Sequence, residues 1–152
     1  MPGYKGHLIG GVVTYGLGLY VLSSLHPSYA TMAEWLLCVL AGALFPDIDI
    51  KSKGQKLFYR FLIVLFAFLV ASRRYQLLIF ISILAIVPMI VRHRGLFHKL
   101  WFVVGFPLLL ALCLGAFFPV YRTILLYDVL FFIAGAISHL WLDLGLRRML
   151  RF

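Results

Sequence analysis

The chain has 152 residues, of which 64% are hydrophobic and only 12% are charged, whereas about a quarter of a typical soluble domain is charged. A soluble fold of this length buries only about 70% of its surface, so it could not hide this much apolar surface from water. The formal charge of +9 does not indicate nucleic-acid binding, because the basic residues lie in short loops between apolar stretches. Composition therefore predicts a single membrane domain over residues 1–152 that contacts membrane lipids, anionic phospholipid included.

Six apolar stretches approach the length of about 20 residues that a membrane-spanning helix needs. In chain order they are Gly6 to Leu25, Thr31 to Phe45, Leu57 to Ser72, Tyr75 to Val91, Leu100 to Phe118 and Thr123 to Leu146. The third and fourth are short, but the Arg73-Arg74 pair between them would be costly at the bilayer centre, so two spans joined by a tight turn are favoured. The sequence thus predicts an all-α integral membrane protein, a compact bundle of about six transmembrane helices.

The distribution of basic residues predicts the orientation of this bundle. Six spans place both termini, the second loop and the fourth loop on one side of the membrane. That side carries eleven Lys and Arg residues and the opposite side carries three. The positive-inside rule therefore predicts cytoplasmic termini in a multi-pass protein of the inner (cytoplasmic) membrane.

The first span carries small residues on one helical face. Gly11, Thr14 and Gly18 follow His7 at intervals of three or four, and small residues let helices approach closely in lipid. We expect this face to turn inward and to take His7 with it. Tryptophans near the span ends, Trp35 included, are interpreted as interfacial anchors, together with Trp101 and Trp141.

Most of the five histidines and five carboxylates gather at the predicted cytoplasmic face. They are His7 at the start of the first span, Asp47 and Asp49 after the second, His93 and His98 in the fourth loop, and His139 and Asp143 at the end of the sixth. The topology was derived from Lys and Arg alone, so this agreement is independent of it. Ionisable residues at membrane depth are rare unless they have a function.

These residue types and spacings indicate a metal site. His139 and Asp143 are four residues apart on one helical face, and Gly135 extends that face and lets a neighbouring helix approach. Asp47 and Asp49 follow a proline that ends a helix, so they can serve one ion or be shared between two. Imidazole and carboxylate ligands without thiolate suit Zn, Mn or Fe better than Mg or Ca. A purely structural polar cluster remains the alternative.

The remaining polar residues are interpreted as structural. His26 lies beside Pro27 on the far side, Glu34 precedes a helix and offsets its dipole, and Asp128 pairs within the bundle or reaches the far interface. Cys38 and Cys113 lie singly in apolar runs, which argues against a disulfide or a thiolate metal site.

Four motifs in order resemble the YdjM-type membrane-bound metal-dependent hydrolases. They are Gly6-His7, Phe45-Pro46-Asp47-Ile48-Asp49, His93-Arg94-Gly95-Leu96-Phe97-His98 and Ser138-His139-x-x-x-Asp143, which together extend from residue 7 to residue 143. Phe97 departs from the pattern, because a small hydroxyl residue such as Thr is expected there. The family is more remotely similar to the zinc-dependent phospholipase C and single-strand nuclease group, a resemblance that implies phosphoester hydrolysis.

The leading hypothesis is therefore a hydrolase at the cytoplasmic interface that acts on a lipid or lipid-linked phosphoester. One or two divalent transition metal ions, with Zn expected and Mn or Fe as alternatives, would be held by His7, Asp47, His93, His98, His139 and Asp143. Asp49 would orient or deprotonate the attacking water, and Arg94, helped by Lys99, would balance charge on the phosphoryl oxygens. The alternatives are a transporter or ion-binding protein that uses the same residues, and a noncatalytic membrane scaffold. Haem ligation is disfavoured by the accompanying carboxylates.

Overall fold

The computed structural model describes residues 3–47, 53–90 and 96–145, and these ranges contain helices and no strands. The six α-helices are α1 (Tyr4–Val21), α2 (Tyr29–Leu44), α3 (Lys53–Ala71), α4 (Tyr75–Ile90), α5 (Leu100–Phe117) and α6 (Arg122–Leu144). Short 3-10 segments are η1 (Ser23–Leu25), η2 (Phe45–Asp47), η3 (Leu96–His98) and η4 (Pro119–Tyr121). Each α-helix corresponds to one of the six predicted apolar stretches, so the predicted all-helical fold is confirmed.

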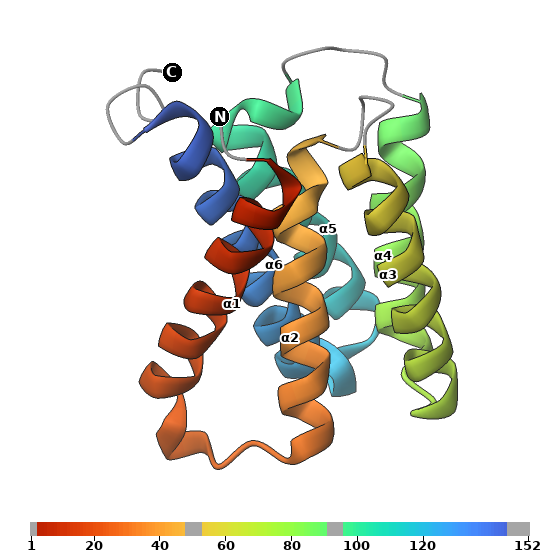
Figure 1. Ribbon diagram of the computed structural model, residues 1–152. Coiled ribbons are helices and arrows are strands. Elements are labelled where there is room, and N and C mark those ends of the chain that lie inside the picture. The colour runs from red at the N-terminus through yellow and green to blue at the C-terminus, as the bar shows by residue number, and fades with distance from the viewer. Residues whose placement is uncertain (1–2, 48–52, 91–95, 146–152) are drawn as a thin grey trace.

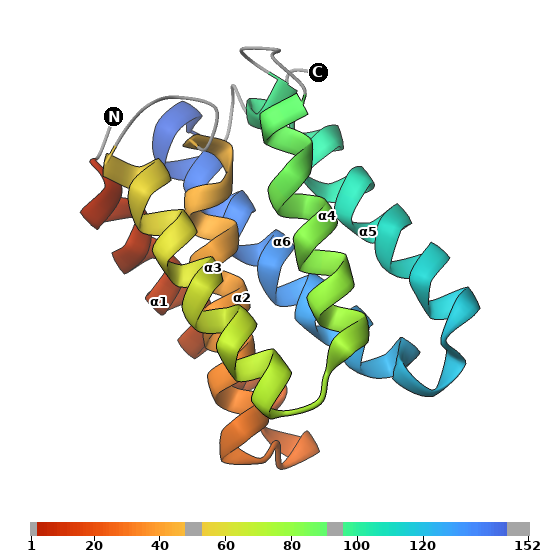
Figure 2. The same ribbon diagram turned by 90° about the vertical axis from the view of Figure 1, so that its right-hand side faces the viewer.

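The helices pack around a central pair, α2 and α6 (Figure 1). α1 packs against both members of the pair and α5 packs against α6, while α3 contacts α2. Figure 2 shows α3 and α4 as an antiparallel hairpin at the side of the bundle, as the Arg73-Arg74 pair between them predicted. The start of α1 and the ends of α2 and α6 lie together at one end, which we call the His/Asp end (Figure 1).

Glycines allow α2 and α6 to touch backbone to backbone. A Cβ atom at Gly42 would lie 1.9 Å from the carbonyl oxygen of Phe132, and one at Gly135 would lie 2.1 Å from the carbonyl oxygen of Val39. Neither position can carry a larger residue without separating the helices. This contact sets the distance between the two helices that deliver most of the polar residues at the His/Asp end.

The predicted inward face of α1 is confirmed. His7 and Gly11 are buried, and a Cβ at Gly11 would lie 3.1 Å from that of Ala43 on α2. Further along, a Cβ at Gly18 would lie 2.7 Å from the Phe131 ring on α6. The opposite face of α1 exposes large apolar side chains such as Ile9 and Leu17.

Three helical segments of the described residues are long and apolar enough to cross a membrane. They are Tyr29–Asp47, Leu100–Phe117 and Pro119–Leu144. α4 has 16 residues, which extend about 24 Å and fall short of a hydrocarbon core of about 30 Å. Membrane crossing by all six helices, and the side on which the termini lie, stay predictions.

Two sequence-based interpretations are wrong. Trp35 is not an interfacial anchor, because it is buried and stacks on Phe131 at 4.7 Å between ring centroids. Glu34 does not precede a helix, because α2 begins at Tyr29 and places Glu34 one turn inside, where its buried carboxylate forms an ion pair with Arg74. The first error concerns which face of α2 meets the other helices, and the second concerns where α2 begins.

The remaining interpretations concern the other two tryptophans, the cysteines and Asp128. Trp101 and Trp141 are more than half exposed near the ends of α5 and α6, as anchors would be. Cys38 and Cys113 are both free thiols, as expected. The expected pairing of Asp128 within the bundle is not found, because Asp128 is buried in α6 and neither of its carboxylate oxygens has a hydrogen-bond partner among the described residues.

Candidate metal centre

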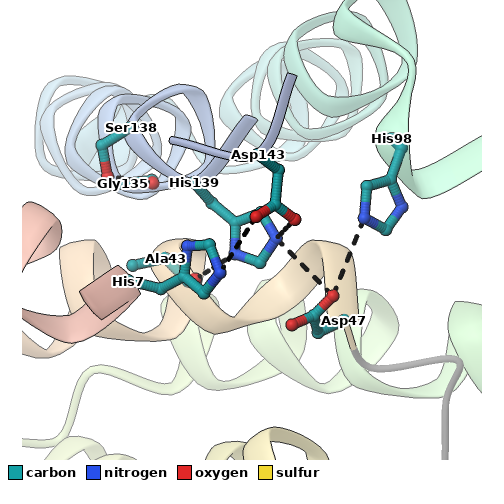
Figure 3. A network of polar contacts seen from close by, with 8 residues as sticks. All are labelled: His7, Ala43, Asp47, His98, Gly135, Ser138, His139 and Asp143. Carbon is teal, nitrogen blue, oxygen red and sulfur yellow. Dashed lines mark hydrogen bonds and ion pairs between the residues drawn. The ribbon is translucent and has the colours of Figure 1, made fainter. Parts of the chain in front are cut away.

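Four of the predicted metal ligands meet at the His/Asp end (Figure 3). Asp47, His98, His139 and Asp143 each offer a ligand atom, and these four atoms all lie within 4.8 Å of one another. His139 Nε2 is 3.3 Å from Asp143 Oδ2 and 3.6 Å from Asp47 Oδ1. His98 Nε2 is 3.7 Å from the same Asp47 oxygen. Three segments that are distant in the sequence thus converge on one point.

His139 is oriented by a backbone carbonyl. Its Nδ1 atom lies 2.7 Å from the carbonyl oxygen of Ala43 on α2, and since a carbonyl can only accept, Nδ1 carries the proton that is donated. In the neutral ring, Nε2 then has a free lone pair, and it points toward Asp47 and Asp143. A metal-binding histidine is usually held in this way by a partner on its other nitrogen.

The contact between Gly135 and α2 makes this hydrogen bond possible. Gly135 lies one turn before His139, and its missing side chain lets α6 touch α2 at Val39 and Ala43. The ring of His139 therefore sits against the last turns of α2 and is fully buried. The predicted role of Gly135, to admit a neighbouring helix, is confirmed.

Aromatic packing brings η2 and η3 together. Phe45, two residues before Asp47, contacts the ring of Phe97 edge-on at 5.4 Å between centroids. Phe97 also meets Phe102 at 5.2 Å and is fully buried. Phe97 thus packs in the core where the family resemblance led us to expect a hydroxyl group, and this packing places the adjacent His98 beside Asp47.

His7 joins the cluster through Asp143 and His139. Its Nε2 atom is 3.4 Å from Asp143 Oδ1, and its ring stacks on that of His139 at 3.7 Å between centroids. It stands outside the group of four whose ligand atoms are mutually within 4.8 Å. His7 is therefore placed to hold Asp143 in position or to serve a second ion.

The cluster has a buried side and an open side. The side chains of His7, His139 and Asp143 are at most 5% exposed, whereas those of Asp47 and His98 are 28% and 25% exposed. Anything that enters the centre from outside the bundle therefore meets Asp47 and His98 first.

The donor chemistry of the cluster fits a bound cation. His139 Nε2 and Asp143 Oδ1 are buried, and neither has a hydrogen-bond partner in the described part of the chain. Nε2 of His139 lies 3.3 Å from a carboxylate oxygen of Asp143 and 3.6 Å from one of Asp47, so two carboxylates and an imidazole converge on one point. A divalent ion could satisfy these atoms, and imidazoles together with carboxylates are typical of transition-metal ligand sets.

Some predicted residues cannot be placed. Asp49, His93 and Arg94 lie outside the described residues. Lys99 is described and half-buried at the N-cap of α5, directly after His98. Their assigned roles stay predictions.

Sequence reasoning missed the carbonyl of Ala43. A backbone carbonyl carries no residue-type signal, and Ala43 is 96 residues from His139. The only local hint is the small pair Gly42-Ala43, which indicates a close helix approach without naming the partner.

Residues 1–148 match the family described as YdjM inner membrane protein. The chain belongs to this family. It is therefore a membrane protein, consistent with its three candidate membrane-spanning helices. No curated protein and no solved structure matches the chain, and the more remote similarity to the phospholipase C and nuclease group stays a prediction.

Proposed function

We propose that this YdjM family member is a metal-dependent hydrolase that cleaves a phosphoester of a lipid or lipid-linked substrate at the cytoplasmic membrane interface. The observation that supports it best is the convergence of Asp47, His98, His139 and Asp143, with His139 oriented by Ala43. A purely structural polar cluster would usually give each buried polar atom a hydrogen-bond partner, whereas His139 Nε2 and Asp143 Oδ1 have none among the described residues.

The position of the cluster along the helices supports a lipid substrate. Asp47 closes one candidate span and Asp143 is near the end of another, so the centre would lie close to the headgroup region. The ester bonds of phospholipids and of lipid-linked phosphates lie at that depth. The exposed sides of Asp47 and His98 would face the incoming phosphate.

The protein side chains would divide the chemistry. Asp47, His98, His139 and Asp143 would hold the ion, with His7 and the predicted ligand His93 added if there are two. A divalent ion there supplies Lewis acidity and a water of lowered pKa. Asp49 would take a proton from the attacking water, and Arg94 with Lys99 would balance negative charge on the phosphoryl oxygens. Water oxygen would bond to phosphorus, the ester P–O bond would break, and the leaving oxygen would take a proton.

The test combines metal analysis with a substrate panel. The protein purified in detergent is measured for bound transition metal and then incubated with phospholipids and isoprenoid phosphates, with and without a chelator. We expect at least one equivalent of metal, and cleavage that stops when the metal is removed. His139→Ala should lose both metal and cleavage.

His26→Asn is the matched control. His26 is exposed, lies outside the cluster and has a left-handed backbone (φ 45°) that Asn tolerates, so this variant should bind metal and cleave like the wild type. Wild-type protein without metal, or His139→Ala with full metal content, would refute the site. Bound metal without cleavage of any ester, together with metal uptake into vesicles, would favour the transporter hypothesis over the hydrolase.

A further inference from the structure

A second polar cluster lies inside the bundle, away from the metal centre. Glu34 of α2 and Asp128 of α6 are both at most 1% exposed, and Arg74, in the turn between α3 and α4, forms an ion pair with Glu34. Asp128 and His139 are eleven residues apart on α6, which corresponds to about 16 Å along the helix. The two clusters are therefore separate sites.

Asp128 is the exceptional member of this cluster. Neither of its carboxylate oxygens has a hydrogen-bond partner in the described ranges, and Glu34 Oε1 is buried without one too. Glu34 at least has the guanidinium of Arg74. A buried ionised carboxylate with neither a hydrogen bond nor a counter-ion of its own is very unfavourable, and such a group normally takes up a proton.

The charges around Asp128 do not balance. Asp128 and Glu34 come from turns of α6 and α2 that pack together, because Trp35, next to Glu34, lies 5.7 Å from Tyr127, next to Asp128, between ring centroids. Asp128 is therefore close enough to Glu34 and Arg74 for their charges to act on it. Two carboxylates thus share one guanidinium. Among the described residues of the helices packed against α6, the only ionisable side chain of α5 is the exposed thiol of Cys113. On α1, Lys5 and His7 lie at the His/Asp end, Tyr20 is exposed, and Tyr15 donates its hydroxyl hydrogen to the Met32 carbonyl. Arg122, at the start of α6, is exposed.

We propose that Asp128 and Glu34 form a proton-binding site inside the helix bundle, with the proton carried by Asp128. A proton needs only one carboxylate oxygen and cancels the single excess negative charge. A divalent ion would be repelled by the guanidinium of Arg74 and would find neither imidazole nor thiolate ligands beyond Cys38. Buried ionisable residues within membrane-spanning helices are characteristic of proton-binding positions.

The proton would exchange from the side of Arg74. The Arg74 side chain is 23% exposed, whereas that of Glu34 is fully buried. A cavity of about 10 Å³, lined by Arg74, Gln76 and Tyr121 among others, lies beside it, and Gln76 Oε1 is buried without a hydrogen-bond partner in the described residues.

Infrared spectroscopy of the purified protein tests the proposal without any assay of activity. The chain has only five Asp and Glu residues, so the carbonyl stretch of a protonated carboxyl can be assigned by substitution. We expect such a band at neutral pH in the wild type, its loss in Asp128→Asn, and its retention in Asp143→Asn, a change within the metal centre. Arg74→Gln should roughly double the band, because two carboxyls then need protons, whereas Arg74→Lys should leave it unchanged.

Thermal denaturation gives a second measurement. The native state would hold a proton that the unfolded chain releases at neutral pH, so the wild type should lose up to tenfold in its folding equilibrium constant per unit rise in pH, and Asp128→Asn should lack this component. Absence of the band in the wild type would overturn the proposal even if no variant folds. The proposal would also be overturned if the band were lost in Glu34→Gln but not in Asp128→Asn. It would likewise be overturned if Na⁺ or K⁺ stabilised the wild type but not Asp128→Asn.

Discussion

Replacing Gly135 with alanine tests whether the contact between α2 and α6 orients His139. The added Cβ would lie 2.1 Å from the Val39 carbonyl oxygen, and real Cβ atoms stay at least 3.0 Å from such neighbours. The two helices must therefore separate locally by about 1 Å, since tightly packed backbones cannot absorb the overlap. The hydrogen bond from His139 to Ala43, now 2.7 Å long, would stretch beyond the usual limit of about 3.2 Å.

The separation of the helices should lower both the stability of the protein and its affinity for metal. Overpacking of this kind typically costs about 1–3 kcal/mol of stability. Loss of the partner that orients a metal-binding histidine typically weakens metal binding about 10- to 100-fold. We therefore expect Gly135→Ala to remain a folded protein with a lower melting temperature and a metal affinity reduced by that factor.

The assay is competition for metal with a coloured chelator in detergent, alongside thermal denaturation. Gly16→Ala is the matched control, because a Cβ at Gly16 of α1 meets nothing within 4 Å and should be neutral or stabilising by up to about 1 kcal/mol. Folded Gly135→Ala that binds metal as tightly as Gly16→Ala would refute the claim that the helix contact positions His139.

Three further results are expected. Phe97→Ala should destabilise the protein by about 3–5 kcal/mol and weaken metal binding, because a fully buried ring that packs beside His98 is lost. Phe117→Ala is the control, because the Phe117 ring is 80% exposed and its loss should change the melting temperature little. Equal effects of the two substitutions would contradict the role of Phe97. Metal at 100 times its dissociation constant should stabilise the wild type by about 2.7 kcal/mol over chelator-treated protein, and the same difference in His139→Ala would show that metal binds elsewhere. Acidification should release metal reversibly, because imidazole must be neutral to bind, and metal content after dialysis at a series of pH values checks this; retention at acidic pH would argue against histidine ligands.

The sequence by itself determined the helices and the composition of the metal centre. Apolar runs interrupted by charged loops predict the number and order of the helices, because helix formation and burial in lipid depend on residues close together in the chain. The ends are less exact, since α3 begins at Lys53, four residues before the predicted Leu57. The same runs carry His7, Asp47, His139 and Asp143 at their ends, so an even number of alternating helices brings them to one end of the bundle. The convergence could therefore be predicted before any contact was known.

Only the tertiary structure decided which helix faces meet. Trp35 in the core, the ion pair between Glu34 and Arg74, and the unpartnered Asp128 all depend on how α2 and α6 are rotated against their neighbours. Most faces of a helix in lipid are apolar, so hydropathy scarcely distinguishes the buried face from the lipid-facing one. The rotation follows from close backbone contacts such as that of Gly135 with Val39, between residues far apart in the sequence.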